Sequence, residues 1–127
     1  GHVFLACTFG PIYRSTDNGS TWQLASTGYG EPMVTPLSVN TQGTLFAGGM
    51  SDVYRSTDDG GSWFKTATLP GTAFSAAQIR CFGINPDGKV FAATSLGVFR
   101  STDDGISWFK TTDGLTDSSV TANGVPT

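Results

Sequence analysis

Acidic side chains are the first candidates for chemistry in this chain, which carries one glutamate and nine aspartates. Hydrolysis of a glycosidic bond uses two carboxyl groups at a controlled separation, one of them with a raised pKa. Five aspartates stand in three copies of one short motif, and a sixth, Asp87, stands in a turn. Glu31, Asp52, Asp113 and Asp117 remain, and nothing in their spacing predicts a pair, so we assign no catalytic residue.

Other catalytic and metal-binding patterns are weaker still. His2 is the single histidine, and with no acid or nucleophile near it in sequence we expect a solvated terminal residue or a tag remnant. Asp58 and Asp59 resemble part of a calcium loop, but the alternating acidic ligands and the closing glutamate are missing. Asn18 begins a formal glycosylation sequon, yet the sister repeats have aspartate there, so we expect a turn residue. We expect no metal and no cofactor.

The composition limits the partners. The formal net charge is −3 and the seven basic residues are dispersed, whereas nucleic-acid binding usually needs a clustered basic surface. No apolar run approaches the ~20 residues of a membrane-spanning helix. Cys7 and Cys81 are too few for a disulfide framework, and because both stand in strand-like runs we expect buried free thiols. Seventeen glycines and only 13% charged residues suit short strands joined by tight turns.

An internal repeat positions all of these residues. Segments 12–22, 53–63 and 98–108 align without gaps, and six of their eleven positions hold the same residue in all three. Their serines, Ser15, Ser56 and Ser101, are 41 and 45 residues apart. A period of this length built from short strands is typical of propeller blades.

The rest of each period predicts the other strands of a blade. Apolar runs at 3–6, 45–48 and 90–93 precede the motifs. Before the second and third of these runs stand further strands, at 34–39 and 79–84, each followed by an Asn- and Gly-containing turn. Each repeat therefore predicts four antiparallel strands, A to D, and the chain is an all-β unit of three blades over residues 1–127.

The motif at 15–22, 56–63 and 101–108 fits Ser-x-Asp-x-Gly-x-x-Trp. It resembles the Asp-box, or BNR repeat, of sialidases, xyloglucanases, sortilin-type receptors and photosystem II assembly propellers. In such propellers the box implies a structural role on the face opposite the ligand pocket, and the family resemblance alone implies a secreted or extracytoplasmic location. A sialidase would also need an arginine triad in the innermost strands, whereas Arg14, Arg55 and Arg100 stand beside the boxes in strand C.

Each motif position has a physical reason. The glycine can supply a positive φ in a hairpin turn, the aspartate can accept hydrogen bonds from turn amides, the serine can pair with the turn backbone, and the tryptophan can bury a large ring against the neighbouring sheet. The structural residues assigned in this way are Ser15, Asp17, Gly19, Trp22, Ser56, Asp58, Gly60, Trp63, Ser101, Asp103, Gly105 and Trp108.

Ligand binding, if any, is expected where the D-to-A loops converge near the propeller axis. These loops hold Tyr29, Glu31 and Phe74, and Arg80 begins an inner strand, a mixture suited to a glycan or a peptide. The alternative is that Phe74 is packed and the others are ordinary loop residues. The residues favour a non-catalytic module that scaffolds or binds a ligand; the alternative is a fragment of a carbohydrate-active enzyme whose catalytic residues lie elsewhere.

The two ends of the chain predict self-assembly. Residues 1–4 match 88–91, so the chain begins at strand B, and residues 120–125 match strand A at 79–84. From Ser101 through the end of one copy to Ser15 of the next is again 41 residues. We expect a homodimer in which each chain lends its last strand to the other's first blade, closing a six-bladed ring, with a trimer as the lesser alternative.

Overall fold

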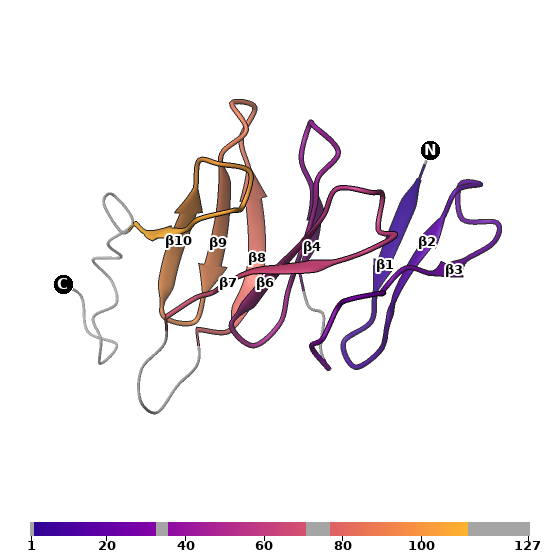
Figure 1. The fold of residues 1–127 in the computed structure, drawn as a ribbon, viewed down its shortest axis with the longest axis horizontal. Coiled ribbons are helices and arrows are strands. Elements are labelled where there is room, and N and C mark those ends of the chain that lie inside the picture. Colours follow the sequence, from indigo (N-terminus) through magenta and orange to yellow (C-terminus); the bar gives the residue numbers. More distant parts are fainter. Residues whose placement is uncertain (1, 33–35, 71–76, 112–127) are drawn as a thin grey trace, which may run out of the picture.

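The computed structural model describes residues 2–32, 36–70 and 77–111, and within these ranges the chain forms only strands, turns and loops. Eleven strands make three antiparallel sheets that lie side by side along the length of the molecule (Figure 1). The strands are β1 (Val3–Ala6), β2 (Ile12–Ser15) and β3 (Gln23–Leu24) in the first sheet; β4 (Leu37–Val39), β5 (Leu45–Gly48), β6 (Asp52–Ser56) and β7 (Phe64–Thr68) in the second; and β8 (Ile79–Ile84), β9 (Val90–Thr94), β10 (Gly97–Ser101) and β11 (Phe109–Lys110) in the third.

The three sheets repeat one register. In each, the strand before the repeated motif pairs with the strand that ends in the motif serine: Val3 lies opposite Ser15, Leu45 opposite Ser56 and Val90 opposite Ser101. The second and third sheets are complete four-stranded meanders, so the predicted all-β, blade-type architecture is confirmed. The first sheet has three described strands, and the strand expected from residues 120–125 lies outside the described residues.

The core lies between neighbouring sheets, which we call blades 1 to 3. One apolar cluster joins blade 1 to blade 2 through Ile12, Leu45 and Trp63, and a second joins blade 2 to blade 3 through Val53 and Ile79. All four residues of β5 are buried because blade 2 is covered on both faces. The alternation of a strand therefore sends Leu45 toward blade 1 and Phe46 toward blade 3.

The described part of the chain covers blade 1 on one face only. Val3 and Leu5 of β1 are 39% and 48% exposed, whereas the residues in the same register of blade 2, Leu45 and Ala47, are 2% and 0% exposed. The exposed pair points away from blade 2, because Phe4, between them, packs into the cluster that joins blades 1 and 2. We call the exposed side of blade 1 its outer face.

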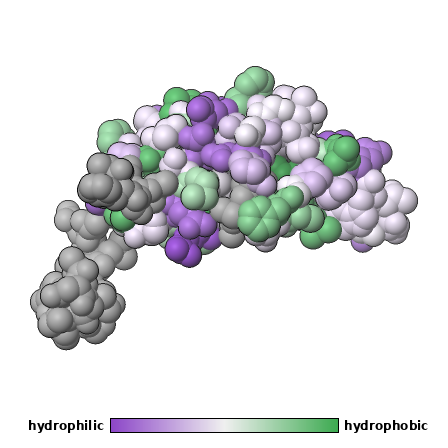
Figure 2. Space-filling model, turned by 90° about the horizontal axis from the view of Figure 1, so that it is seen from below, coloured by the Kyte–Doolittle hydropathy of each residue, from purple (hydrophilic) through white to green (hydrophobic). Residues whose placement is uncertain are grey.

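The connections divide between the two ends of the blades. The A-to-B turns at 40–44 and 85–88 rise at one end, and the loops that lead from one blade to the next lie at the other (Figure 1). Figure 2 views the molecule from the second end, the loop side, where hydrophobic side chains reach the surface in separate places. In the described ranges there is no helix of a length and hydropathy that would let it cross a membrane.

The expected burial of the two cysteines is wrong. Both thiols are exposed, and no disulfide links them. Cys7 lies in the loop after β1 rather than in a strand. Cys81 does lie in β8, but its neighbour Phe82 packs toward blade 2, so Cys81 points to the side of blade 3 that no described element covers.

Candidate functional site

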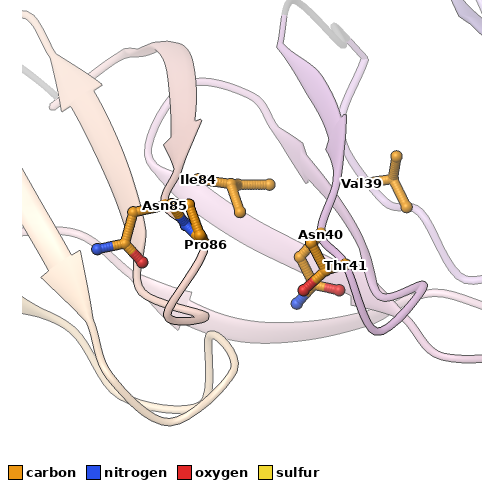
Figure 3. A pocket seen from close by; sticks show the side chains of 6 residues that line it. All are labelled: Val39, Asn40, Thr41, Ile84, Asn85 and Pro86. Atoms are coloured by element: carbon orange, nitrogen blue, oxygen red, sulfur yellow. The ribbon is translucent and has the colours of Figure 1, made fainter.

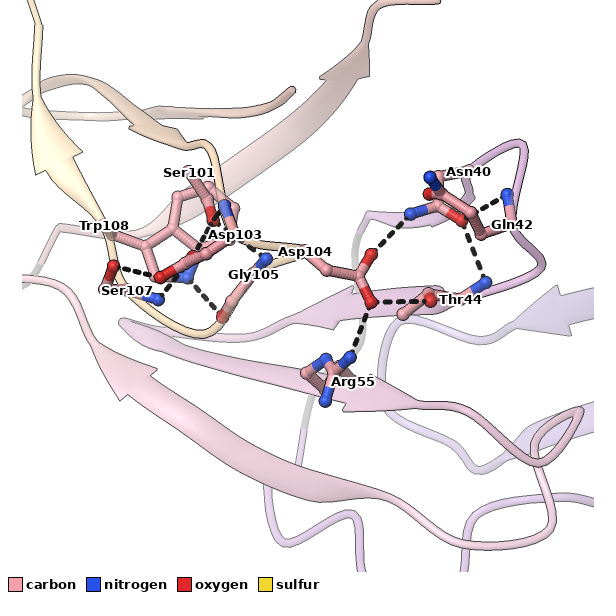
Figure 4. A network of polar contacts seen from close by, with 10 residues as sticks. All are labelled: Asn40, Gln42, Thr44, Arg55, Ser101, Asp103, Asp104, Gly105, Ser107 and Trp108. Atoms are coloured by element: carbon pink, nitrogen blue, oxygen red, sulfur yellow. Dashed lines mark hydrogen bonds and ion pairs between the residues drawn. The ribbon is translucent and has the colours of Figure 1, made fainter. Parts of the chain in front are cut away.

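The repeated turns at 15–22, 56–63 and 101–108 share one set of hydrogen bonds. In the second turn the buried Ser56 hydroxyl donates to Asp58 at 2.8 Å and accepts from the Gly60 amide at 2.9 Å. The other Asp58 contacts come from Ser62, whose amide donates at 2.8 Å and whose hydroxyl donates at 2.6 Å. Equivalent bonds link Ser15, Asp17, Gly19 and Thr21 in the first turn and Ser101, Asp103, Gly105 and Ser107 in the third (Figure 4).

The backbone of these turns needs two successive residues at positive φ. Asp59 has φ 60° and Gly60 has φ 81°, and the Gly61 amide donates to the Asp58 carbonyl at 3.1 Å. Positive φ at both central residues is the pattern of a type I′ hairpin turn, which suits asparagine or aspartate followed by glycine. Asn18 has φ 58° in the same position, so the formal sequon coincides with a turn residue.

The motif aspartates are held as carboxylates. Hydrogen bonds lower the pKa of Asp17, Asp58 and Asp103 from 3.8 to about 2, and the largest contribution is in each case the hydroxyl four residues on. All three carboxyl groups are turned to solvent, yet their oxygens are occupied by bonds inside the turn. This arrangement describes a turn-stabilising group rather than a catalytic acid.

The three motif tryptophans differ in what covers them. Trp63 is 2% exposed, and its Nε1 donates to the Ala25 carbonyl of blade 1 at 2.7 Å. Trp108 is half-buried and donates instead to Gly105 of its own turn, 2.9 Å away. Trp22 is 37% exposed, against the expectation of burial, because it lies on the outer face of blade 1, which no described blade covers.

The blades are joined by a polar contact that recurs. Arg14 of blade 1 donates through Nη1 to the Asp59 carbonyl at 2.7 Å and lies 3.4 Å from the Asp59 carboxylate. Arg55 of blade 2 donates to the Asp104 carboxylate at 2.6 Å. Both acceptors are the residue just before the motif glycine of the next blade, and they are not the aspartates that hold the turn itself.

A second polar group supports each of these contacts. Thr44 donates its hydroxyl to Asp104 at 2.9 Å, and the Asn40 amide donates to the same carboxylate at 2.7 Å (Figure 4). In blade 1 the position of Thr44 is taken by His2, whose Nδ1 lies 2.5 Å from the Asp59 carboxylate. His2 is exposed, as expected, but it also contacts an acid that the sequence analysis did not identify, because Asp59 is 57 residues away in sequence.

An aromatic contact completes each junction. A Cβ built on Gly60 would lie 2.9 Å from the Phe4 ring, and one built on Gly105 would lie 2.4 Å from the Phe46 ring. Each motif glycine thus leaves room for a phenylalanine from the preceding blade. At each blade junction, a phenylalanine, an arginine and one further polar residue of one blade contact two adjacent turn residues of the next blade.

The loop side gathers some of the predicted ligand residues. The Tyr29 ring lies 4.6 Å from the Tyr54 ring and 6.2 Å from that of Trp63, measured between centroids, and burial raises the pKa of Tyr29. Burial also raises the pKa of Glu31, as do the charge of Asp52 and a hydrogen bond to it. Asp52 in turn lies 3.6 Å from Lys65 and accepts from Thr68, so it is tied into blade 2.

The remaining predicted ligand residues lie apart from this group. Arg80 is exposed and is the extra residue of a β-bulge in β8, because Ile79 pairs with Thr94 and Cys81 with the adjacent Ala93. Phe74, Asp113 and Asp117 lie outside the described residues. Tyr29 and Glu31 share one loop, as the sequence predicted, and the structure places Asp52 beside it, a neighbour that sequence spacing did not single out.

Two hollows lie beside the inner strands. One of about 320 Å³ separates the turn ends of β4 and β8 (Figure 3) and is lined by Val39, Asn40, Thr41, Ile84, Asn85 and Pro86. The side-chain amide of Asn40, which lines this hollow, already donates to Asp104. Few convergent polar groups therefore remain for a ligand. The other, of about 250 Å³, lies between β1 and β4 and is lined by His2, Val3, Phe4, Leu37, Ser38, Val39 and Leu45.

No group of three or more His, Cys, Asp or Glu side chains in the described ranges is arranged to hold a metal ion. The search against protein-family models gives no match to the chain, and the search of curated proteins gives none.

Solved structures do resemble it. An ancestral GH74 enzyme matches with a TM-score of 0.66 and 22% identity, over 85% of this chain and 16% of that one. YCF48 bound to D1 peptide matches with a TM-score of 0.55 and 20% identity, over 87% and 35%. The fold is that of β-propeller blades. A Dyadobacter fermentans protein of unknown function matches with a TM-score of 0.57 and 20% identity, over 85% and 41%.

The blades described here therefore correspond to a part of each longer chain, since 16% to 41% of those chains is covered. Identities of 20% to 22% establish the propeller fold and no more. The closer resemblance to Asp-box propellers remains a prediction.

Proposed function

We propose that this chain is a non-catalytic propeller module that closes a six-bladed ring with a second copy of itself. The observation that supports this most directly is the outer face of blade 1. Val3 and Leu5 are exposed there, although their counterparts in blade 2 are fully buried by a neighbouring blade. A blade face built from the same residue types needs the same cover, and a second copy supplies it.

The hollow between β1 and β4 is consistent with an added strand that would form part of that cover. Among the described strands β1 pairs only with β2, so no described strand pairs with its inner edge. Residues 120–125 resemble the inner strand at 79–84 and are the segment we propose for this edge, donated by the second copy. Added strands of this kind gain affinity from main-chain hydrogen bonds and specificity from alternate side chains in pockets.

Mass in solution tests the proposal. The ring model expects a species of twice the 13.3 kDa chain mass by sedimentation equilibrium. Leu5→Glu should shift the equilibrium to monomer because it places a charge on the buried face. Phe64→Glu, at another exposed apolar residue, on an outer strand, is the control and should leave the dimer intact. A well-folded wild-type monomer would overturn the ring.

Deleting residues 119–127 separates strand donation from face-to-face docking. The truncated chain is expected to lose the dimer and to aggregate or unfold, because the β1 edge is then unpaired. A truncated chain that still forms a stable dimer would contradict strand donation and retain only the docking of faces.

A ligand-binding role on the loop side is the second candidate. Tyr29 and Glu31 are held beside Asp52 by packing and hydrogen bonding, and a carboxyl group with a raised pKa at a loop junction is a frequent feature of binding sites. YCF48, a structural neighbour, is described with a bound peptide. Titration of ¹⁵N-labelled protein with xyloglucan oligosaccharides or with D1 peptide should shift the amides around residues 29–31 if this candidate is right.

Hydrolysis by the described carboxylates is not supported. The pKa of Glu31 is raised in part by a hydrogen bond with Asp52, so the two carboxyl groups are direct neighbours. Two-carboxylate glycosidases hold the groups about 5 to 9.5 Å apart, so that a sugar and often a water fit between them. We propose that the purified chain releases no product from xyloglucan; turnover abolished by Glu31→Gln would overturn this.

A further inference from the structure

Each described blade junction has a donor side and an acceptor side. At the junction of blades 1 and 2 the donor side is Phe4, Arg14 and His2, and the acceptor side is Asp59 and Gly60. The junction of blades 2 and 3 repeats this arrangement one blade later, with Phe46, Arg55 and Thr44 on the donor side. Because the same strand positions supply the contacts twice, the register also identifies their third occurrence.

The third donor set is Phe91, Arg100 and Lys89 of blade 3. Phe91 lies opposite Arg100, as Phe4 lies opposite Arg14 and Phe46 opposite Arg55. No described residue accepts from Arg100, whose side chain is exposed, and Lys89 and Phe91 are only half-buried. Phe46, the counterpart of Phe91, is in contrast fully buried under blade 3.

The matching acceptor is the first repeated turn, at the opposite end of the chain. Asn18 and Gly19 have φ values of 58° and 91°, close to those of Asp59 and Gly60, so the turn offers the same shape. Among the described residues, a Cβ built on Gly19 would meet Trp22 of its own turn alone, at 3.6 Å. None of the described phenylalanines lies there, whereas Phe4 lies at Gly60 and Phe46 at Gly105.

We infer that the donor set of Phe91, Arg100 and Lys89 docks onto Asn18 and Gly19 of a second copy of this chain. This inference rests on the proposed ring and assigns the residues and chemistry of its intermolecular junction. The Phe91 ring covers Gly19, and Arg100 donates to the backbone carbonyl of Asn18 as Arg14 donates to that of Asp59 at 2.7 Å.

Asparagine at this position makes the intermolecular junction different in charge from the two inside the chain. The internal junctions each pair an arginine with a carboxylate, at Asp59 and Asp104. Asn18 keeps the carbonyl acceptor and the turn geometry but offers no negative charge. The arginines of blades 1 and 2 therefore favour the acidic turns of their own chain over the neutral turn at Asn18.

The substitution Asn18→Asp tests this directly, since aspartate already occupies the same turn position twice. In the full-length chain it should lower the dimer dissociation constant ~5–30-fold, because each ring gains two partly exposed ion pairs. The gain should shrink as salt is raised. Arg100→Ala should raise the constant at least about tenfold, and Lys110→Ala, on the outer strand of the same blade, should leave it unchanged.

A charge swap separates contact from a fold defect. Arg100→Glu should weaken the dimer, and adding Asn18→Lys should recover part of the loss, since the opposite charges then face each other. Near-ultraviolet circular dichroism checks that every variant is folded. A wild-type dimer whose dissociation constant is unchanged by Asn18→Asp and Arg100→Ala would overturn this junction and leave the ring standing. A wild-type monomer would overturn both.

Discussion

Trp63 donates its indole N–H to the main-chain carbonyl of Ala25 at 2.7 Å, across the boundary between blades 1 and 2. The amide of Trp63 also donates to the Thr27 carbonyl at 2.8 Å, so one residue carries two bonds to the preceding blade. Its ring fills the apolar cluster between them and is 2% exposed. The side chain therefore joins the blades through packing and hydrogen bonding together.

Replacing Trp63 with alanine should lower the free energy of unfolding by ~3–5 kcal/mol, because a large buried ring leaves a cavity. Urea unfolding followed by circular dichroism measures the change. Trp22→Ala is the internal control: its ring is 37% exposed, so the loss should be smaller at low protein concentration and grow under conditions that favour the dimer. Equal losses at both sites under dilute conditions would contradict the difference in burial.

Gly28→Ala should destabilise the chain more than Gly43→Ala, although both glycines have nearly the same positive φ, +88° and +89°. At Gly43 an added Cβ meets nothing within 4 Å, so only the backbone strain of ~1–2 kcal/mol applies. At Gly28 it would lie 2.3 Å from the Trp63 carbonyl oxygen, and main chain must move. Thermal melts of the two variants measure the difference, and similar melting temperatures would contradict the close approach.

Acid should unfold the protein through the motif aspartates. The pKa values of Asp17, Asp58 and Asp103 are about 2 in the fold, below the ordinary 3.8, so their contribution is present above about pH 4 and is lost as the pH falls toward 2. Urea midpoints should therefore decline between about pH 4 and pH 2. The triple asparagine variant should be less stable at neutral pH and show a flatter decline; an unchanged slope would contradict the assignment.

Sequence periodicity was sufficient for the blade architecture, because strand order and turn chemistry are encoded locally. The type I′ turns follow from Asn-Gly and Asp-Gly, and the register of Ser15, Ser56 and Ser101 follows from the repeat. What could not be read locally is which face of a blade is covered. The sequence around Trp22 and Cys81 resembles the sequence around buried strand residues. Both residues are nevertheless exposed, because no described blade lies against them.

The junction contacts were missed for a related reason. His2 and Arg14 reach Asp59 from a distance of more than forty residues, and no spacing rule links them. The signal that could have found them is the repeat itself: an arginine one residue before each motif serine, and an Asp or Asn one residue before each motif glycine. The loop-side neighbour of Glu31 depends likewise on how blade 2 packs beside blade 1, which the sequence did not specify.

Asp104→Asn should cost more stability than Asp59→Asn, although both remove the carboxylate of a blade junction. The Asp104 carboxylate accepts from Arg55, Thr44 and Asn40, so its loss weakens three bonds and should lower the unfolding free energy by ~1–2 kcal/mol. The Asp59 carboxylate contacts His2 and, at 3.4 Å, Arg14, whose shorter bond of 2.7 Å goes to the Asp59 carbonyl, which asparagine retains. Chemical denaturation of the two variants compares them directly, and a larger loss at Asp59 would reverse the assignment.

Glu31→Gln should stabilise the fold at neutral pH. The pKa of Glu31 is raised, first by burial and then by the charge of Asp52, so the folded state binds its proton more tightly than the unfolded chain does. Stability from this group is present below its unfolded pKa and lost as the pH rises through the folded value. Glutamine is neutral at every pH, so the variant should unfold at a higher urea concentration at about pH 7 and match the wild type near about pH 4. Asp52→Asn removes the negative charge that repels Glu31, but it also removes the carboxylate that contacts Lys65 and Thr68. It should therefore not reproduce the gain in stability. If Glu31→Gln instead lowers stability at neutral pH, the carboxylate has a favourable partner and the loop would need to be reinterpreted as a charged contact.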